Sequence, residues 1–297
     1  MKNALRMLPV LLIGGLAAGE EQAPKPTAAE VAMPSEAELM KIERDAHSGL
    51  LLITALVADT PMRMILDTGA THTILHEGSV AKLKKNYFWI DTSHIIFEGN
   101  TQQKPKMLAA PLMAGPGISP RHALVVLNLG AVRSMMGEEI DGIIGMDILG
   151  SLPFTFNLKQ NELYWGTPEG AVLTPLYGTM TRGGRMMVKA KCGSKEVEML
   201  LDTGSAVTRL KKGDWEAGVA GEIMAKMGNV NNTTQGKMLE GKPADIEVAE
   251  GVKLRNVAPL LEEPGAPVLL GLDALKEAVL IHLPTEDSDY GKFFMVP

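Results

Sequence analysis

The sequence contains a single cysteine, Cys192, so an intramolecular disulfide is excluded. Cys192 precedes Gly193-Ser194 in a predicted hairpin turn, and we expect a structural thiol there rather than a nucleophile. Aromatic residues make up only 4% of the chain, whereas methionine occurs 19 times, and most of these methionines are expected to fill the core. The sequence has no lysine and arginine cluster, and its formal net charge is −6, which argues against nucleic-acid binding. A chain of 297 residues can nevertheless bury one large core or two modest ones.

The sequence also lacks an apolar run long enough to span a membrane comfortably as a helix. The run at 7–18 follows two basic residues, Lys2 and Arg6, and ends in small residues before Glu20. This arrangement predicts a signal peptide over 1–19, cleaved near Gly19, and export to a periplasm or out of the cell. An uncleaved membrane anchor is the alternative. After cleavage, no membrane span is expected.

The segment 20–47 is rich in alanine, proline and glutamate. This composition indicates a linker or a pro-segment, with a short element at its end.

Beyond residue 48 one pattern of motifs occurs twice in the chain. ILDTGATHTIL at 65–75 returns as LLDTGSAVTRL at 200–210, and EIDGIIGMDIL at 139–149 returns as APVLLGLDAL at 266–275. Each copy then ends in a hairpin-like tail, at 154–165 and at 279–296. Alternating apolar residues and turn signals predict strands in both copies. We therefore expect an N-terminal lobe at 48–167, a connection at 168–182 and a C-terminal lobe at 183–297.

The repeated acids, Asp67 and Asp202, each follow an apolar strand, where an isolated ionised carboxylate would be costly. Two such acids brought together share one proton, so that one acts as a base on water while the other donates to a carbonyl oxygen. The neighbouring glycines permit a tight turn, and the neighbouring threonines can hydrogen-bond across the interface. Five residues are predicted to support the acids: Thr68, Gly69, Thr203, Gly204 and Ser205.

The two acid loops differ at one position, where Ala70 in the first corresponds to Ser205 in the second. A hydroxyl donated to the Asp202 carboxylate would favour its charged form. This predicts Asp202 as the ionised partner and Asp67 as the protonated one.

On these motifs the sequence resembles the retropepsin/pepsin-like aspartic peptidases, and most of all bacterial proteins with two retropepsin-like lobes in one chain. The resemblance implies an all-β fold of two closed-barrel-like lobes with few short helices and an active cleft between them. It implies a catalytic pair, Asp67 and Asp202, and segments packing behind the acid loops at Ile144, Gly145, Leu270 and Gly271. It also implies flap-forming hairpins near 99–107 and 231–239, with substrate-binding residues expected at Phe97, Gln102 and Thr234.

The activity that this resemblance implies is an exported aspartic endopeptidase acting on polypeptides as a monomer with pseudo-twofold symmetry. No metal or organic cofactor is expected. The alternative is a catalytically silent two-lobed module that binds or scaffolds peptides.

Two other acids and two histidines need separate interpretations. Asp147 and Asp273 each precede a short helix-like stretch, which predicts an N-cap role rather than catalysis. His72 and His76 have the spacing of a metal-binding pair on a helix, but THTILH reads as extended, so no metal site is predicted there.

Overall fold

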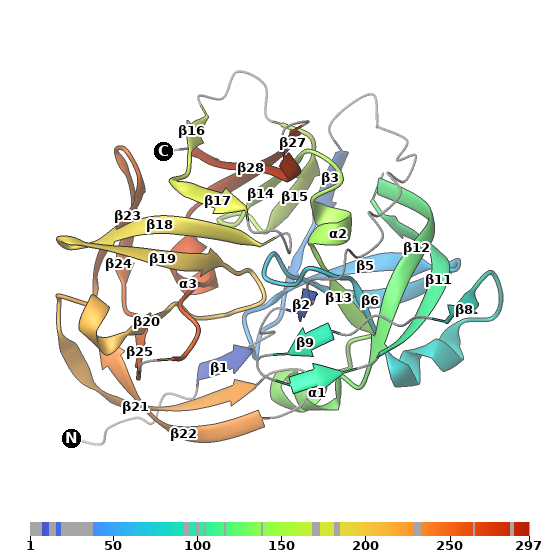
Figure 1. Ribbon diagram of the computed structural model, residues 1–297, viewed down its shortest axis with the longest axis horizontal. Helices are drawn as coiled ribbons and strands as arrows, with labels where there is room; N and C mark the ends of the chain where they lie inside the picture. Colours follow the sequence, from blue (N-terminus) through green and yellow to red (C-terminus); the bar gives the residue numbers. More distant parts are fainter. Residues whose placement is uncertain are drawn as a thin grey trace.

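The computed structural model describes residues 8–11, 16–18, 38–91, 96–98, 101–103, 105–115, 117–137, 139–167, 173–180, 185–228, 233–263, 265–285 and 288–296. These residues form mainly β-strands, gathered in two lobes and a sheet that joins them (Figure 1). The helices among them are short: α1 (Gly130–Met136), α2 (Met146–Leu149), α3 (Leu272–Leu275), and the 3-10 turns η1 (Glu77–Lys82) and η2 (Lys212–Asp214). The predicted all-β fold class is confirmed.

The first lobe is built on a closed ring of six strands. In ring order these are β5 (Leu51–Val57), β6 (Thr60–Leu66), β13 (Gly142–Ile144), β7 (Ile74–His76), β12 (Gly117–Leu127) and β11 (Lys106–Ala114). β11 closes the ring by pairing back onto β5, with Leu112 opposite Val57. Two strands lie at the ends of this sheet, β4 (Glu43–Arg44) and β8 (Phe88–Ile90). The inward residues of β5 and β6 are apolar and fully buried, as expected for a barrel interior.

The second lobe repeats this order of strands. β18 (Met186–Cys192), β19 (Lys195–Leu201), β26 (Leu269–Leu270), β20 (Arg209–Lys211) and β25 (Leu260–Glu262) correspond to β5, β6, β13, β7 and the end of β12. The matching pairs are parallel in both lobes: β13 with β6, β26 with β19, β12 with β7, and β25 with β20. The internal repeat in the sequence therefore corresponds to a repeat in strand pairing.

The ring of the second lobe is open, so this lobe is a half-barrel beside the closed barrel of the first, and the two are barrel-like as predicted. β23 (Ala244–Ala249) pairs with β18 and with β24 (Val252–Val257), but Ala258 and Pro259 separate β24 from β25. Proline has no backbone N–H to donate to a sheet ladder, so it interrupts the strand at this point. β25 pairs instead with β22 (Thr233–Gly241), which forms a long hairpin with β21 (Val219–Gly228). β17 (Gly178–Met180) completes this sheet on β18.

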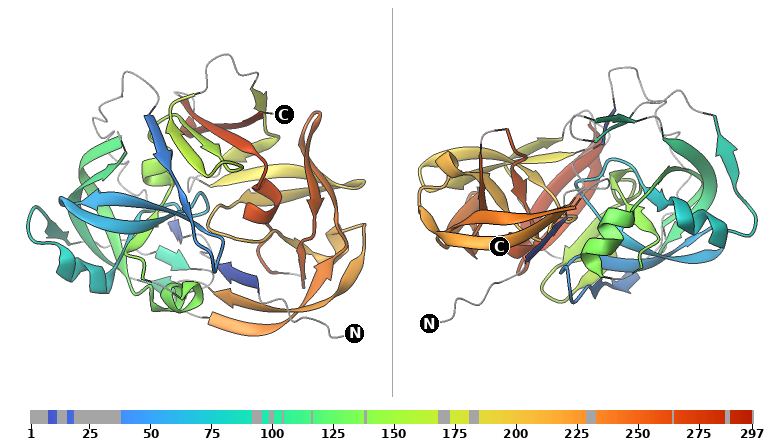
Figure 2. Two further views of the ribbon diagram at one scale, coloured as in Figure 1. Left: turned by 180° about the vertical axis from the view of Figure 1, so that it is seen from behind. Right: turned by 90° about the horizontal axis from the view of Figure 1, so that it is seen from below.

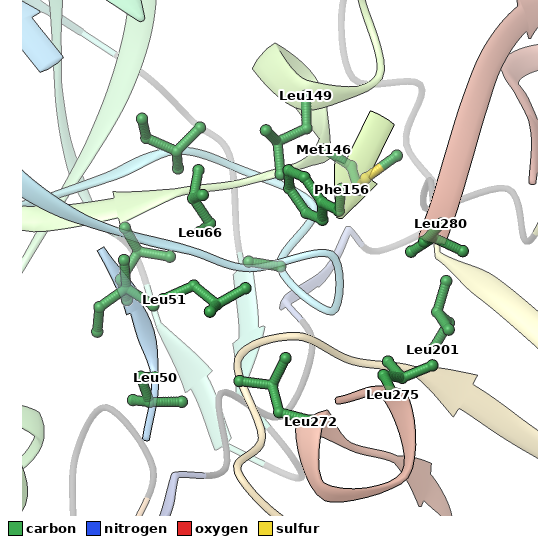
Figure 3. Packing of buried hydrophobic residues seen from close by; sticks show 14 of the residues in the cluster. Leu50, Leu51, Leu66, Met146, Leu149, Phe156, Leu201, Leu272, Leu275 and Leu280 are labelled. Carbon is green, nitrogen blue, oxygen red and sulfur yellow. The ribbon is translucent and has the colours of Figure 1, made fainter. Parts of the chain in front are cut away.

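The tails of the two repeats pair with each other in a six-stranded sheet. Its order is β16 (Thr174–Pro175), β28 (Ser288–Val296), β27 (Val279–Thr285), β14 (Phe154–Asn157), β15 (Glu162–Trp165) and β3 (Glu38–Lys41). β14 and β27 join the halves, with Phe156 opposite Leu280. Both residues belong to a buried cluster that extends into both lobes, as Leu66 and Leu201 show in Figure 3. Residues 38–44, where the sequence indicates a short element at the end of the linker or pro-segment, form β3 and β4.

Two short strands come from the predicted signal peptide. β1 (Leu8–Leu11) pairs with β21, and β2 (Leu16–Ala18) pairs with β9 (Ile96–Glu98), which forms a hairpin with β10 (Thr101–Gln103). The views in Figure 2 place the blue-green first lobe and the yellow-orange second lobe on opposite sides of the molecule. The rest of the predicted signal peptide and residues 20–37 of the predicted linker lie outside the described residues. Within the described part of the chain, no helix has the length and apolarity needed to cross a membrane.

Candidate active site

The two acid loops lie at equivalent strand ends. Asp67 directly follows β6, and its N–H donates to the Ile144 carbonyl at 3.0 Å; Asp202 directly follows β19, and its N–H donates to the Leu270 carbonyl at 3.0 Å. The segments predicted to pack behind the loops are thus in contact with them.

Glycine is required at the next position of each backing segment. A Cβ atom at Gly145 would lie 2.6 Å from the His72 carbonyl oxygen, and one at Gly271 would lie 2.5 Å from that of Val207. Both distances are far below van der Waals contact, so only glycine lets the backbone approach this closely.

The two loops are locked together by four hydrogen bonds through Thr68 and Thr203. The Thr68 N–H donates to Thr203 Oγ1 at 3.0 Å, and the Thr203 N–H donates to Thr68 Oγ1 at 3.1 Å. Each hydroxyl donates in turn across the junction, Thr68 to the Leu201 carbonyl and Thr203 to the Leu66 carbonyl, both at 2.9 Å. Both threonines are completely buried. The hydrogen bonding expected between the loops is therefore present.

The two carboxyl groups lie against each other's loops. A Cβ at Gly69 would be 2.6 Å from Asp202 Oδ1, and a Cβ at Gly204 would be 2.5 and 2.6 Å from the two Asp67 carboxylate oxygens. Asp67 has no exposed surface and Asp202 is 1% exposed. Two acids separated by 135 positions in the chain thus form one buried pair.

The two acids differ in the number of N–H groups that they accept. Asp67 Oδ1 accepts the N–H groups of Gly69 (2.8 Å) and Ala70 (3.1 Å), whereas Asp202 Oδ1 accepts only that of Gly204, at 2.9 Å. Burial raises the pKa of Asp67 to about 6, and the interaction with Asp202 and these N–H groups keep it from rising further. Burial, together with the charge of Asp67, raises the pKa of Asp202 well above its ordinary value. These contacts therefore favour negative charge on Asp67 and the proton on Asp202.

This assignment reverses the one made from the sequence. The Ser205 hydroxyl donates to the Val207 carbonyl at 2.8 Å and not to Asp202, and the Ser205 N–H goes to the Asp202 backbone carbonyl. Because Ala70 in the first loop donates its N–H to the carboxylate, the extra stabilisation of negative charge falls on Asp67.

Asp147 and Asp273 do not act as N-caps, contrary to prediction. The N-cap residues of α2 and α3 are Gly145 and Gly271, and each acid lies in the first turn. Asp147 accepts the N–H and the hydroxyl of Thr73, and Asp273 accepts those of Thr208, all between 2.6 and 2.7 Å. The two acids therefore tie the strand leaving each acid loop to the short helix behind it.

The threonines in these contacts carry a role that the sequence analysis missed. Thr73 and Thr208 stand at the same offset from the two acids, and each hydroxyl also accepts the N–H of the glycine behind its loop, at 3.2 Å. Their shared offset was the available signal.

The surroundings of these two supporting acids differ. Burial would raise the pKa of Asp147, but His122, whose Nε2 lies 3.0 Å from Asp147 Oδ2, contributes to lowering it below the ordinary value. Asp273 has no such histidine among its described contacts, and burial raises its pKa to about 6.

The residues predicted to bind substrate lie on the two hairpins. Phe97 and Gln102 are directly opposite each other on β9 and β10, and Thr234 lies opposite Met227 on β22, where it is exposed. The side chains of Phe97 and Gln102, and the turns at 99–100 and 229–232, lie outside the described residues.

His76 and Cys192 are both buried in the fold. His76 lies in an extended strand, and its Nδ1 accepts the Leu129 N–H at 3.0 Å. Over the described ranges, no group of three or more His, Cys, Asp or Glu side chains is placed to hold a metal ion. Burial raises the pKa of Cys192 to about 12, so its thiol is protonated at neutral pH.

Comparison with known proteins agrees with this site. Residues 53–148, which include Asp67 and the Ile144-Gly145 segment behind it, match the family described as aspartyl protease. None of the curated proteins matches the chain. The family supports aspartic peptidase activity and a polypeptide substrate in general terms. Residues 53–148 of the chain are therefore similar to an aspartyl protease domain.

Proposed function

We propose that the protein is an aspartic endopeptidase in which one carboxyl from each lobe activates the attacking water. The observation that carries this proposal is the buried Asp67–Asp202 pair, held by the reciprocal threonine hydrogen bonds. Asp67 Oδ2 is the oxygen that the backbone N–H groups leave available, since Gly69 and Ala70 both donate to Oδ1.

The reaction follows from the two protonation states. Ionised Asp67 takes a proton from water as the water oxygen attacks the peptide carbonyl carbon, and Asp202 gives its proton to the carbonyl oxygen. The intermediate is a neutral gem-diol, with Asp67 now protonated and Asp202 ionised. It breaks down when Asp67 gives its proton to the departing nitrogen and Asp202 recovers one from a gem-diol hydroxyl, which returns both acids to their starting forms.

The two hairpins support binding of an extended polypeptide. β1 pairs along the free edge of β21, and β2 pairs along the free edge of β9, so both edges accept an added strand. Main-chain pairing of this kind binds a peptide with little dependence on its side chains. We propose that the substrate polypeptide pairs with these same edges.

We propose further that residues 1–19 are a signal peptide and that the mature protein acts outside the cytoplasm as a monomer. Removal of this segment would take β1 and β2 away from the hairpins and free their edges for substrate. The N-terminal sequence of the protein purified from an exporting host tests the cleavage. A mature start near residue 20 supports export, and an intact N-terminus in the membrane fraction supports the anchor instead.

Digestion of a broad peptide library between pH 3 and pH 8 tests the activity. Asp67→Asn and Asp202→Asn are the matched variants, because asparagine keeps the Oδ1 atom that accepts the loop N–H groups. We expect internal cleavage by the wild type, loss of cleavage in both variants with folding retained, and a fall in kcat/KM below about pH 6 as Asp67 gains its proton. A folded wild type that binds peptides but cleaves none at any pH would identify a silent binding module.

A further inference from the structure

A cation lies beside the acid pair in the second lobe and has no counterpart in the first. The β18–β19 pairing ends with Met187 opposite Leu200, and Arg185 and Asp202 each lie two residues beyond this pair. Arg185 and the acid are therefore at the same end of the hairpin. The charge of Arg185 acts on both carboxyls of the pair.

The equivalent position in the first lobe is apolar. In the β5–β6 hairpin the pairing ends with Leu52 opposite Ile65, and Leu50 and Asp67 each lie two residues beyond this pair. Leu50 is completely buried and belongs to the core (Figure 3). The repeat therefore places leucine beside one acid and arginine beside the other.

The Arg185 side chain is partly buried beside the acid pair. Its Nη2 atom is buried, and desolvation lowers the pKa of the side chain while Asp202 and then Asp67 raise it. The same interaction acts in reverse, because Arg185 lowers the pKa of both carboxyls. Desolvating a cation is costly, and the acid pair supplies negative charge that offsets this cost.

The other described charged groups around the site face elsewhere. Asp147 and Asp273 bond to threonines behind the loops, and His72 and His122 act on Asp147. On the long hairpin Lys226 donates to the Ser134 carbonyl, and Lys237 pairs with Glu222. Arg185 is the cation that acts on both acids of the pair.

We propose that Arg185 is a positioning residue for the peptidase reaction, stabilising the negative charge that Asp202 carries after giving its proton to the substrate carbonyl. This rests on the function proposed above, in which the charge of the pair moves from Asp67 to Asp202. An arginine beside Asp202 and a leucine beside Asp67 favour this movement of negative charge to Asp202.

The test compares the wild type, in the form that N-terminal sequencing identifies as mature, with three variants of the same form. Arg185→Leu copies the first lobe, Arg185→Lys keeps the charge, and Arg185→Gln removes the charge but keeps a polar side chain. The matched control is Lys189→Leu, which removes an exposed cation from the same face of β18, about 13 Å further along the strand. Thermal unfolding of each variant establishes that it is folded.

Two readouts separate this inference from the proposed function. The first is the pH profile of kcat and kcat/KM. We expect Arg185→Leu and Arg185→Gln to lower kcat about tenfold with little change in KM, and to move the acid limb up by about one pH unit. Arg185→Lys should restore most of kcat, and Lys189→Leu should match the wild type.

The second readout does not require hydrolysis. The carboxyl carbons of 13C-labelled aspartate are titrated by NMR, and the two signals of the pair are identified by their loss in Asp67→Asn and Asp202→Asn. Their midpoints should rise by about one pH unit in Arg185→Leu and Arg185→Gln. Unchanged midpoints in either folded variant overturn the role of Arg185, whereas absence of hydrolysis with shifted midpoints overturns only the proposed peptidase function.

Discussion

Replacing Thr203 with valine tests how strongly the two acid loops hold each other. Thr203 is completely buried, and its hydroxyl makes two bonds across the junction, accepting the Thr68 N–H and donating to the Leu66 carbonyl. Valine has nearly the same volume but can do neither. It therefore leaves a buried donor and a buried acceptor without their partners.

The expected loss is large compared with the stability of a protein of this size. Each buried polar group left unpaired costs about 1–3 kcal/mol, so Thr203→Val should lower the free energy of unfolding by about 2–6 kcal/mol. Total stabilities are commonly about 5–15 kcal/mol. Thr68→Val should cost a similar amount, because its hydroxyl makes the equivalent two bonds.

Urea unfolding followed by tryptophan fluorescence measures this loss. Trp165 in β15 and Trp215 after η2 are both buried and report on different parts of the molecule. Thr54→Val is the matched control, because Thr54 is exposed on β5 and its substitution should change stability by less than about 0.5 kcal/mol. If Thr203→Val is as stable as Thr54→Val, the interlock does not stabilise the fold and the reasoning fails.

Three further predictions follow from the same contacts. Gly204→Ala should abolish hydrolysis in a peptide assay, because the added Cβ would lie 2.5–2.6 Å from the Asp67 carboxylate oxygens, whereas Gly236→Ala, with open space around it, should not. Folding raises the pKa of Asp273, so the wild type should lose stability as the pH rises from 3.8 to about 6, and Asp273→Asn should abolish this loss. Folding lowers the pKa of Asp147, so this acid should stabilise the wild type above pH 3.8, with the stabilisation lost as the pH falls, and Asp147→Asn should abolish that dependence. Melting temperatures between pH 3 and pH 8 would distinguish the two opposite dependences. Cys192 should react with a thiol reagent at pH 8 only after unfolding, and reaction of the folded protein at the rate of a free thiol would contradict its burial and raised pKa.

The acid loops could be predicted from the sequence because their structure is decided locally. An apolar strand that ends in Asp-Thr-Gly specifies a buried acid, a bonding hydroxyl and a tight turn within three residues. The second copy, 135 positions later, then indicates that the two loops meet. The interlocking threonines and the segments behind the loops followed from the same comparison.

Strand pairings between distant segments could not be predicted in the same way. The sequence indicates hairpins at 154–165 and 279–296, but nothing local shows that β14 and β27 pair with each other. The break between β24 and β25 falls at Pro259, which is visible in the sequence, but its effect on the ring depends on the distant pairings of β24 with β23 and of β25 with β20.

The sequence analysis placed the negative charge on Asp202, whereas the contacts favour it on Asp67. That analysis considered the Ser205 hydroxyl but not the backbone N–H groups of the two loops. Ser205 has a polar side chain and Ala70 does not, but the Ser205 hydroxyl donates to the Val207 carbonyl. Ala70, which has no polar side chain, donates its N–H to Asp67. The orientation of backbone amides is decided by the loop conformation, which the residue types do not reveal.

Two differences between the repeats lie at the acid pair, and in the proposed reaction they favour different positions of its negative charge. The extra N–H at Asp67 favours the charge there before the reaction. Arg185 interacts with Asp202 more strongly than with Asp67, so it favours the charge that Asp202 carries after giving up its proton. If both influences acted mainly on Asp67, the charge would be held there and proton transfer would have to work against them. Because they act mainly on different members, Arg185 assists the movement of charge to Asp202, and the loop N–H groups assist its return to Asp67.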